Sequence, residues 1–159
     1  MNQQQPSSAF VFAAWAALIT GMITFLVGLW NAEMLLSEKG FYFTVLMFGL
    51  FGAISVQKSV RDQLEDIPVT TIYYGLSWVA TLMPVLLLTI GLWNADLLLS
   101  EKGFYGISFI LSMFAAVVVQ KNTRDAQLSS GETTSPASES GPMRAMSSVK
   151  GMLKPDFSE

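Results

Sequence analysis

The chain has 159 residues, of which 52% are hydrophobic and only 13% are charged, with a net charge of −3 and neither Cys nor His. This composition, with a mean hydropathy of +0.47, is atypical of a water-soluble domain and indicates a membrane protein. The absence of Cys excludes disulfides and thiolate metal sites, and the absence of His removes the commonest metal ligand and proton shuttle. We therefore expect no metal and no cofactor.

Four segments without any Asp, Glu, Lys or Arg follow one another along the chain: Ala9–Trp30, Gly40–Val56, Ile72–Trp93 and Gly103–Val119. The first and third have 22 residues each. As helices they span about 33 Å, enough for a hydrocarbon core of about 30 Å. The second and fourth segments are about 26 Å long as helices. They can span the bilayer if Gln57 and Gln120 extend them and the lysine that follows each Gln snorkels to the interface. A cleavable signal peptide is the alternative for the first segment, but residues 1–8 carry no Lys or Arg.

The chain contains an internal repeat. Residues 28–62 read GLWNAEMLLSEKGFYFTVLMFGLFGAISVQKSVRD, and residues 91–125 read GLWNADLLLSEKGFYGISFILSMFAAVVVQKNTRD, at a constant offset of 63. Each copy holds two apolar segments, so the sequence predicts an all-α membrane protein with four transmembrane helices, arranged as two tandem helical hairpins. Because each copy has an even number of spans, both enter the membrane in the same direction. This predicts a pseudo-twofold axis along the membrane normal.

The segments divide the chain into five parts: a short cytoplasmic N-terminus (1–8), a first two-helix repeat (9–62), a cytoplasmic linker (63–71), a second two-helix repeat (72–125) and a cytoplasmic tail (126–159). The polar, Ser-rich stretch 126–142 predicts a disordered linker. For 143–153 a short amphipathic helix on the membrane surface and a plain disordered tail are alternatives, because so short a helix is unstable in water.

The distribution of Lys and Arg predicts that both termini face the cytoplasm. Only two basic residues then lie in the outer loops, Lys39 and Lys102. The inner helix ends carry four, in two QKxxRD motifs: Lys58, Arg61, Lys121 and Arg124. Contact with lipid phosphates is the first interpretation of these four residues, and docking of a partner protein is the second.

The loop inside each hairpin has nearly the same sequence, WNAEMLLSEKG and then WNADLLLSEKG. We expect residues 31–36 to prolong the long helix, residues 37–39 to form the turn, and Gly40 to supply the backbone freedom of a tight hairpin. The loops also contain four carboxylates, a candidate acidic rim on the outer face: Glu33, Glu38, Asp96 and Glu101. A cation-binding mouth is one interpretation, and a solvated rim beside the loop lysines is the more ordinary one.

Small residues recur at helical spacing within the spans and predict helix packing or oligomerisation: Ala13, Ala17, Gly21, Gly49, Ala53, Ser112 and Ala116. The spans contain no ionisable relay for ion-coupled transport and no nucleophile with a base, so we expect no enzyme. A channel would be marked by hydroxyls facing one cavity, and the candidates are Thr20, Thr24, Ser55, Ser77, Thr81 and Ser112.

The loop motif, followed by a short apolar helix and VQKxxRD, resembles the YiaA/YiaB family of bacterial inner-membrane proteins. The resemblance covers residues 9–125 and implies a multi-pass inner-membrane protein built from tandem two-helix domains, but it implies no reaction. We therefore expect a non-enzymatic membrane-organising or interaction protein. A small oligomeric channel or permeation pathway for a small solute or cation is the alternative. The expected partners are the lipid bilayer and further copies of the chain, with no nucleic acid.

Overall fold

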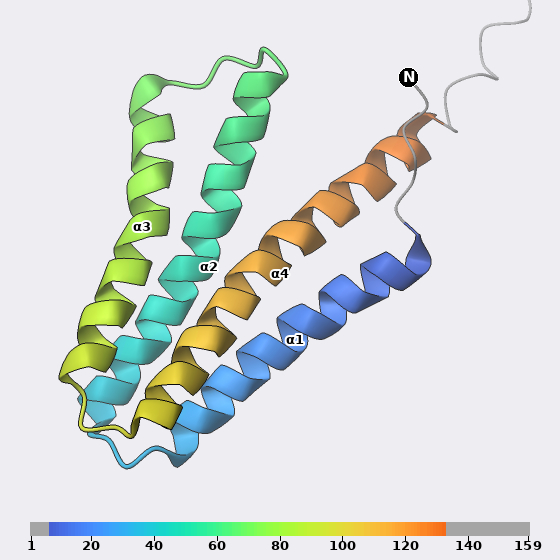
Figure 1. Cartoon of the computed structure of the whole chain (residues 1–159). Helices are drawn as coiled ribbons and strands as arrows, with labels where there is room; N and C mark the ends of the chain where they lie inside the picture. Colours follow the sequence, from blue (N-terminus) through green and yellow to red (C-terminus); the bar gives the residue numbers. More distant parts are fainter. Residues whose placement is uncertain (1–6, 133–159) are drawn as a thin grey trace, which may run out of the picture.

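The computed structural model describes residues 7–132, which form four α-helices: α1 (Ser8–Asn31), α2 (Leu36–Leu64), α3 (Thr71–Asn94) and α4 (Leu99–Glu132) (Figure 1). This part of the chain contains no strand. All four helices are long and apolar enough to cross a membrane. The predicted all-α class with four transmembrane helices is thus confirmed, while residues 143–153 lie outside the described part.

Equivalent polar side chains begin and end helices α1 and α3. Ser7 Oγ accepts a hydrogen bond from Phe10 N at 3.3 Å at the start of α1, and Thr70 Oγ1 accepts one from Tyr73 N at 3.4 Å at the start of α3. These are N-caps, which satisfy amide groups that have no partner within the helix. At the far ends the side-chain amides of Asn31 and Asn94 each donate to a backbone carbonyl one turn earlier, at 2.7 Å.

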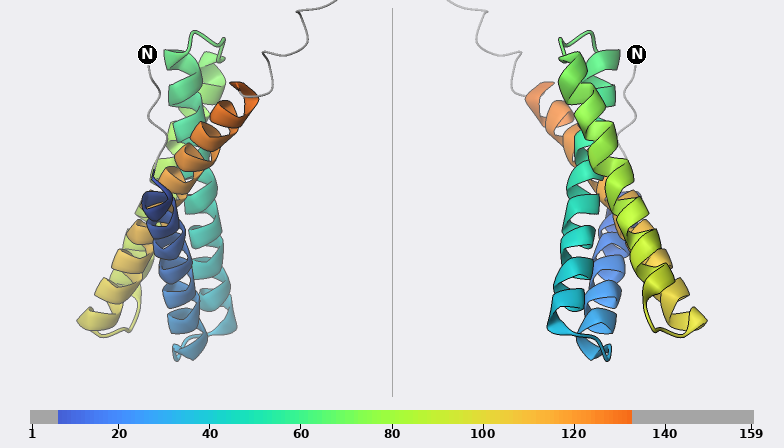
Figure 2. Two further views of the ribbon diagram at one scale, coloured as in Figure 1. Left: turned by 90° about the vertical axis from the view of Figure 1, so that its right-hand side faces the viewer. Right: turned by 90° about the vertical axis from the view of Figure 1, so that its left-hand side faces the viewer.

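The helices pair between the repeats and only weakly within them. α1 lies antiparallel along α4, and α2 lies antiparallel along α3, whereas α1 has few contacts with α2 and α3 has few with α4 (Figures 1 and 2). The order across the molecule is α3, α2, α4, α1, so α2 and α4 form the central pair (Figure 1). Each two-helix repeat is therefore an open hairpin whose helices both pack on the other repeat.

Glycines bring the paired helices close together. A Cβ on Gly52 of α2 would overlap the carbonyl oxygen of Ala80 in α3, and a Cβ on Gly21 of α1 would lie 2.6 Å from Ser112 Oγ in α4. Inside a bilayer the lipid is as apolar as the side chains, so close backbone packing becomes a main source of helix association. The close contacts thus lie where the helices of different repeats meet.

The apolar core lies toward the end of the bundle that holds the two hairpin loops. All four helices contribute to it: Phe25, Leu29, Tyr42, Val45, Leu46, Leu88, Leu92, Tyr105 and Phe109. In its centre Tyr42 of α2 stacks on Tyr105 of α4, with ring centroids 6.1 Å apart and planes 16° apart. These two tyrosines are equivalent in the repeat, which agrees with the pseudo-twofold axis, although the axis itself stays a prediction.

Most of the small residues expected at helix contacts are buried in the structure. Gly21, Gly49, Ala53, Ser112 and Ala116 are buried and Ala17 is half-buried, whereas Ala13 is exposed. The buried stripe of α1 begins one residue later, at Ala14, because that face of the helix turns toward α4. The sequence analysis missed Gly52, where an added Cβ would overlap the Ala80 carbonyl of α3.

The interpretation of the hairpin loop is wrong. Helix α1 ends at Asn31 and α2 begins at Leu36, so residues 32–35 form the turn and Ser37, Glu38 and Lys39 lie in the first turn of α2. Gly40 is inside α2, and no described glycine has a positive φ. The hairpin therefore needs no special glycine conformation, because both helix ends are satisfied by side chains of the loop motif.

The expectation of disorder directly after residue 125 is also wrong. Helix α4 continues to Glu132. Extending an existing helix costs far less than nucleating one, and Ala126, Gln127 and Leu128 all have good helix propensity.

Packing between the repeats can be tested with engineered cysteines in a chain that has none. The Phe104 ring lies against Gly28, and the equivalent Phe41 ring lies against Gly91, so these pairs join α1 to α4 and α2 to α3. Chains with Cys at both members of either pair, and a protease site inserted in 65–70, should be cross-linked by a short bis-maleimide. After cleavage the halves should migrate as one species on a denaturing gel.

The matched control is the cysteine-free chain with the same protease site, which should always give two fragments. Two fragments from a double-cysteine chain whose thiols have all reacted would contradict the pairing of helices between the repeats.

Candidate functional sites at the two ends of the bundle

Glu38 and Glu101, two residues of the predicted acidic rim, cap the helices α2 and α4. Glu38 Oε2 accepts a hydrogen bond from Leu35 N at 2.8 Å, and Glu101 Oε2 accepts one from Leu98 N at 2.9 Å. A carboxylate three residues inside a helix satisfies an amide at the N-terminus and also interacts favourably with the helix dipole. Both side chains therefore have a structural task in the loop.

The neighbouring lysines act on the preceding helices. Lys39 Nζ donates to Trp30 O at the end of α1 at 2.9 Å, and Lys102 Nζ donates to Trp93 O at the end of α3 at 3.4 Å. A cation at a helix C-terminus is favourable because the last carbonyls carry partial negative charge. The SEK triplet thus closes both helix ends at once, which accounts for its presence in both copies.

The other two rim residues, Glu33 and Asp96, have no such contact. Both are exposed in the turns, and neither has a hydrogen bond or ion pair within residues 7–132. Glu38 and Glu101 each accept a capping hydrogen bond, whereas Glu33 and Asp96 do not, although the sequence alone does not distinguish the four carboxylates.

Two cavities with equivalent linings lie at the loop end. One, of about 280 Å³, is lined by Ser37, Glu38, Phe41, Tyr42, Gly91, Asn94 and Ala95. The other, of about 380 Å³, is lined by Gly28, Asn31, Ala32, Ser100, Glu101, Phe104 and Tyr105. Glu38 and Glu101 are thus divided between two cavities, and Glu33 and Asp96 line neither. The four rim residues are not gathered around either cavity.

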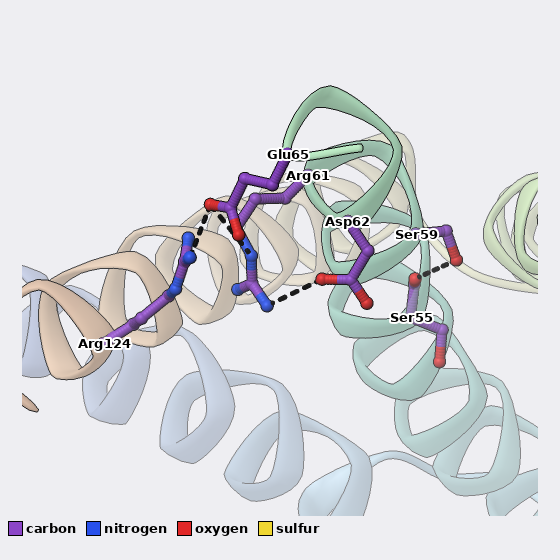
Figure 3. A network of polar contacts seen from close by, with 6 residues as sticks. All are labelled: Ser55, Ser59, Arg61, Asp62, Glu65 and Arg124. Atoms are coloured by element: carbon purple, nitrogen blue, oxygen red, sulfur yellow. Dashed lines mark hydrogen bonds and ion pairs between the residues drawn. The ribbon is translucent and has the colours of Figure 1, made fainter. Parts of the chain in front are cut away.

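At the opposite end the two arginines of the QKxxRD motifs converge on one carboxylate (Figure 3). Arg124 of α4 forms an ion pair with Glu65, just after α2, and Arg61 Nε lies 3.9 Å from the same Glu65 oxygen. Arg61 Nη2 also donates to Asp62 Oδ1 at 3.0 Å. Since Arg61 and Arg124 are equivalent in the repeat, Glu65 joins the two copies. Of the four predicted lipid-facing or docking residues, only Lys58 and Lys121 are exposed.

Polar atoms without a hydrogen-bond partner lie beside this ion-pair network. They are Gln57 Oε1, its equivalent Gln120 Oε1, Arg61 Nε, and Nδ2 of Asn122, a residue only 2% exposed. Asn122 corresponds in the repeat to Ser59. The buried Ser59 hydroxyl does have a partner, because it donates to Ser55 O at 2.8 Å (Figure 3). The sequence analysis did not single out Asn122. The signal for it was a polar residue in both copies at a position that belongs to a buried helix face.

Three of the six hydroxyls expected to line a channel form hydrogen bonds within their own helices. Ser77 donates to Tyr74 O, Thr81 to Ser77 O and Ser112 to Ser108 O, at 2.7 to 2.9 Å. Ser112 faces α1, whereas Ser77 and Thr81 lie on α3, and Thr20 is exposed. The six residues therefore do not form one polar strip along one cavity.

Within the described residues no group of His, Cys, Asp or Glu could hold a metal ion.

Comparison with known proteins shows which family the chain belongs to. A family model described as the yiaA/B two helix domain matches residues 10–62 and again residues 73–125. The chain belongs to the YiaA/B two-helix domain family. The resemblance seen in the loop motif is thereby confirmed, as is the duplication of the domain.

Named relatives agree with this assignment. Inner membrane protein YiaA of Escherichia coli (strain K12) is 57% identical over 128 residues, which cover 80% of this chain and 88% of that protein. Inner membrane protein YiaB of the same strain is 32% identical over 97 residues, or 60% of this chain and 81% of that protein. Uncharacterized membrane protein YubF of Bacillus subtilis (strain 168) is 42% identical over 59 residues, or 36% and 68%. No solved structure matches. The chain is a multi-pass inner-membrane protein.

The helix-capping contacts predict a difference between the two kinds of rim carboxylate. Changing both Glu38 and Glu101 to Ala should lower the free energy of unfolding by about 1–3 kcal/mol, since each lost hydrogen bond contributes about 0.5–1.5 kcal/mol. Gln at both positions should retain most of that stability, because its carbonyl accepts the same bond. Unfolding by sodium dodecyl sulfate in mixed micelles, followed by far-UV circular dichroism, measures the effect.

The matched control changes Glu33 and Asp96 to Ala, which should shift the free energy of unfolding by only a few tenths of a kcal/mol, as exposed substitutions usually do. Equal losses in the two double variants would refute the capping role.

Proposed function

We propose that the protein is non-enzymatic and serves as a membrane-organising or interaction protein, with the cytoplasmic ends of α2 and α4 as its docking surface. The observation that best supports this is the exposure of Lys58 and Lys121, equivalent residues on the helix ends that also carry the ion pairs of Arg61 and Arg124 with Glu65. Their ammonium groups favour a partner with acidic groups.

The packing of the central helices favours this proposal over the channel. Tyr42 stacks on Tyr105 between α2 and α4, and a Cβ on Gly49 of α2 would lie 2.7 Å from the Phe109 ring of α4. Aromatic side chains thus fill the seam along which a pore between the repeats would run. The hydroxyl groups of Ser77, Thr81 and Ser112 are already satisfied within their helices, so they have no need of water in a pore.

The proposal includes an orientation with both termini in the cytoplasm, based on the excess of Lys and Arg at the ends of α2 and α4. A phosphatase reporter is active only outside the cytoplasm, whereas a fluorescent reporter folds within it. Phosphatase inserted at Ser37 should therefore be active, and phosphatase fused after Gln127 inactive. The fluorescent reporter should give the opposite pattern, and activity of phosphatase fused after Gln127 would reverse the orientation.

The docking surface can be tested by site-specific photo-crosslinking in native membranes. A photo-reactive amino acid at Lys58 or Lys121 should give discrete adducts of higher mass, because both side chains are exposed on the proposed docking surface. The same amino acid at Glu33 or Asp96, exposed at the opposite end, is the matched control and should give none. Adducts only from the loop end, or from neither end, would contradict docking at α2 and α4.

The channel alternative is tested on the same protein in vesicles. The proposal expects cation flux into proteoliposomes to equal that into protein-free vesicles, for the parent and for the double variant Glu33→Gln, Asp96→Asn. Flux by the parent that the double variant loses would favour the channel.

A further inference from the structure

An apolar groove lies between α3 and α4 near the hairpin loop that joins them. It has a volume of about 520 Å³, and its lining is Val85, Leu88, Thr89, Leu92, Trp93, Leu99, Lys102, Gly106, Phe109 and Ile110. This volume lies in the range of about 300–1,000 Å³ that is usual for small-molecule sites. Thr89 adds little polarity, because its hydroxyl donates to Val85 O of its own helix at 2.8 Å.

Six of the ten lining positions differ between the repeats, among them positions 106 and 89. Gly106 and Thr89 of the second repeat correspond to Phe43 and Leu26 of the first. Both residues of the first repeat are larger. The groove between α3 and α4 is therefore lined by smaller residues at these two positions than the equivalent surface of the first repeat, in a chain whose loops are otherwise matched almost residue for residue.

Packing does not require glycine at position 106. A Cβ added there would meet no atom within 4 Å, and its φ is not positive. Glycine inside a helix costs about 0.5–1 kcal/mol relative to alanine. At Gly21 and Gly52 this cost is offset by close contact between helices. At Gly106 no such contact offsets it, and the missing side chain leaves open space in the groove.

A cation lies at the mouth of this apolar groove. Lys102 Nζ has three N–H donors, and its one recorded hydrogen bond, to Trp93 O, is 3.4 Å long. It forms no ion pair with a carboxylate within the described residues. The adjacent carboxylate of Glu101 lines the cavity on the α1 side instead. Trp93 is 83% exposed next to Lys102, as expected for an aromatic residue at the depth of the lipid headgroups.

We propose that this groove binds one anionic phospholipid, with an acyl chain between α3 and α4 and its phosphate on Lys102. The apolar lining suits an acyl chain. The ammonium group of Lys102, which has no carboxylate partner within the described residues, suits the negative headgroup at the depth where that headgroup lies. The equivalent face of the first repeat has its own lysine, Lys39, but has the larger Phe43 in place of Gly106. One lipid per chain is the expected stoichiometry.

The test is native mass spectrometry of the full chain, released from detergent after incubation with phosphatidylglycerol or with phosphatidylcholine. The parent should retain one phosphatidylglycerol, and Gly106→Phe, which copies the first repeat, should retain about tenfold less, as expected for a loss of the buried chain contacts. Thr89→Leu, a smaller change that fills part of the same groove, should give an intermediate loss. Lys102→Gln should reduce the preference for phosphatidylglycerol over phosphatidylcholine about fivefold.

Lys39→Gln is the matched control, because it removes the same kind of helix-end contact in the first repeat and should leave lipid retention at the parent level. Circular dichroism and gel filtration establish that each variant is folded. Equal retention by the parent and by folded Gly106→Phe and Thr89→Leu would show non-specific annular lipid only and overturn the proposal. Equal effects of Lys39→Gln and Lys102→Gln would also overturn it.

Discussion

Where α2 meets α3, a Cβ on Gly52 would overlap the carbonyl oxygen of Ala80, so only glycine allows the two backbones to lie at this distance. Gly21 has the same role between α1 and α4, where it faces Ser112. In a bilayer such close approach takes the place of the hydrophobic effect as a force between helices. Both contacts join helices of different repeats. The two helices of one hairpin therefore need not pack on each other, and they have few mutual contacts.

The open hairpins explain the chemistry of the loops. Because α1 and α2 hardly touch each other, the unpaired backbone groups at their adjacent ends depend on side chains of the loop. Glu38 supplies the acceptor that α2 needs, and Lys39 supplies the donor that α1 needs. The second repeat uses Glu101 and Lys102 in the same way. Charges that resemble a binding site in sequence are thus largely engaged in ending helices.

The repeats differ on the helix faces more than in the loops. Gly106 stands where the first repeat has Phe43, and Asn122 stands where it has Ser59. These exchanges open a groove next to α3 and leave a buried amide group without a partner near the end of α4. Duplication alone would give two equivalent surfaces. The proposed lipid groove lies where the copies diverged, whereas the proposed docking surface uses Lys58 and Lys121, which the two copies share.

The sequence by itself determined the four spans, the duplication and the family, because helix length, hydropathy and a repeated motif are local properties that packing does not change. It also indicated Gly21, Gly49 and Ala53 as contact residues. It could not tell Glu38 from Glu33, since both are loop carboxylates and only the position of the helix ends makes one of them a cap. Nor could it pair α1 with α4, predict the contact of Arg124 with Glu65, or reveal the groove at Gly106. These depend on which residues distant in the chain meet, and equivalent helices of a repeat offer several pairings that only complementary packing decides.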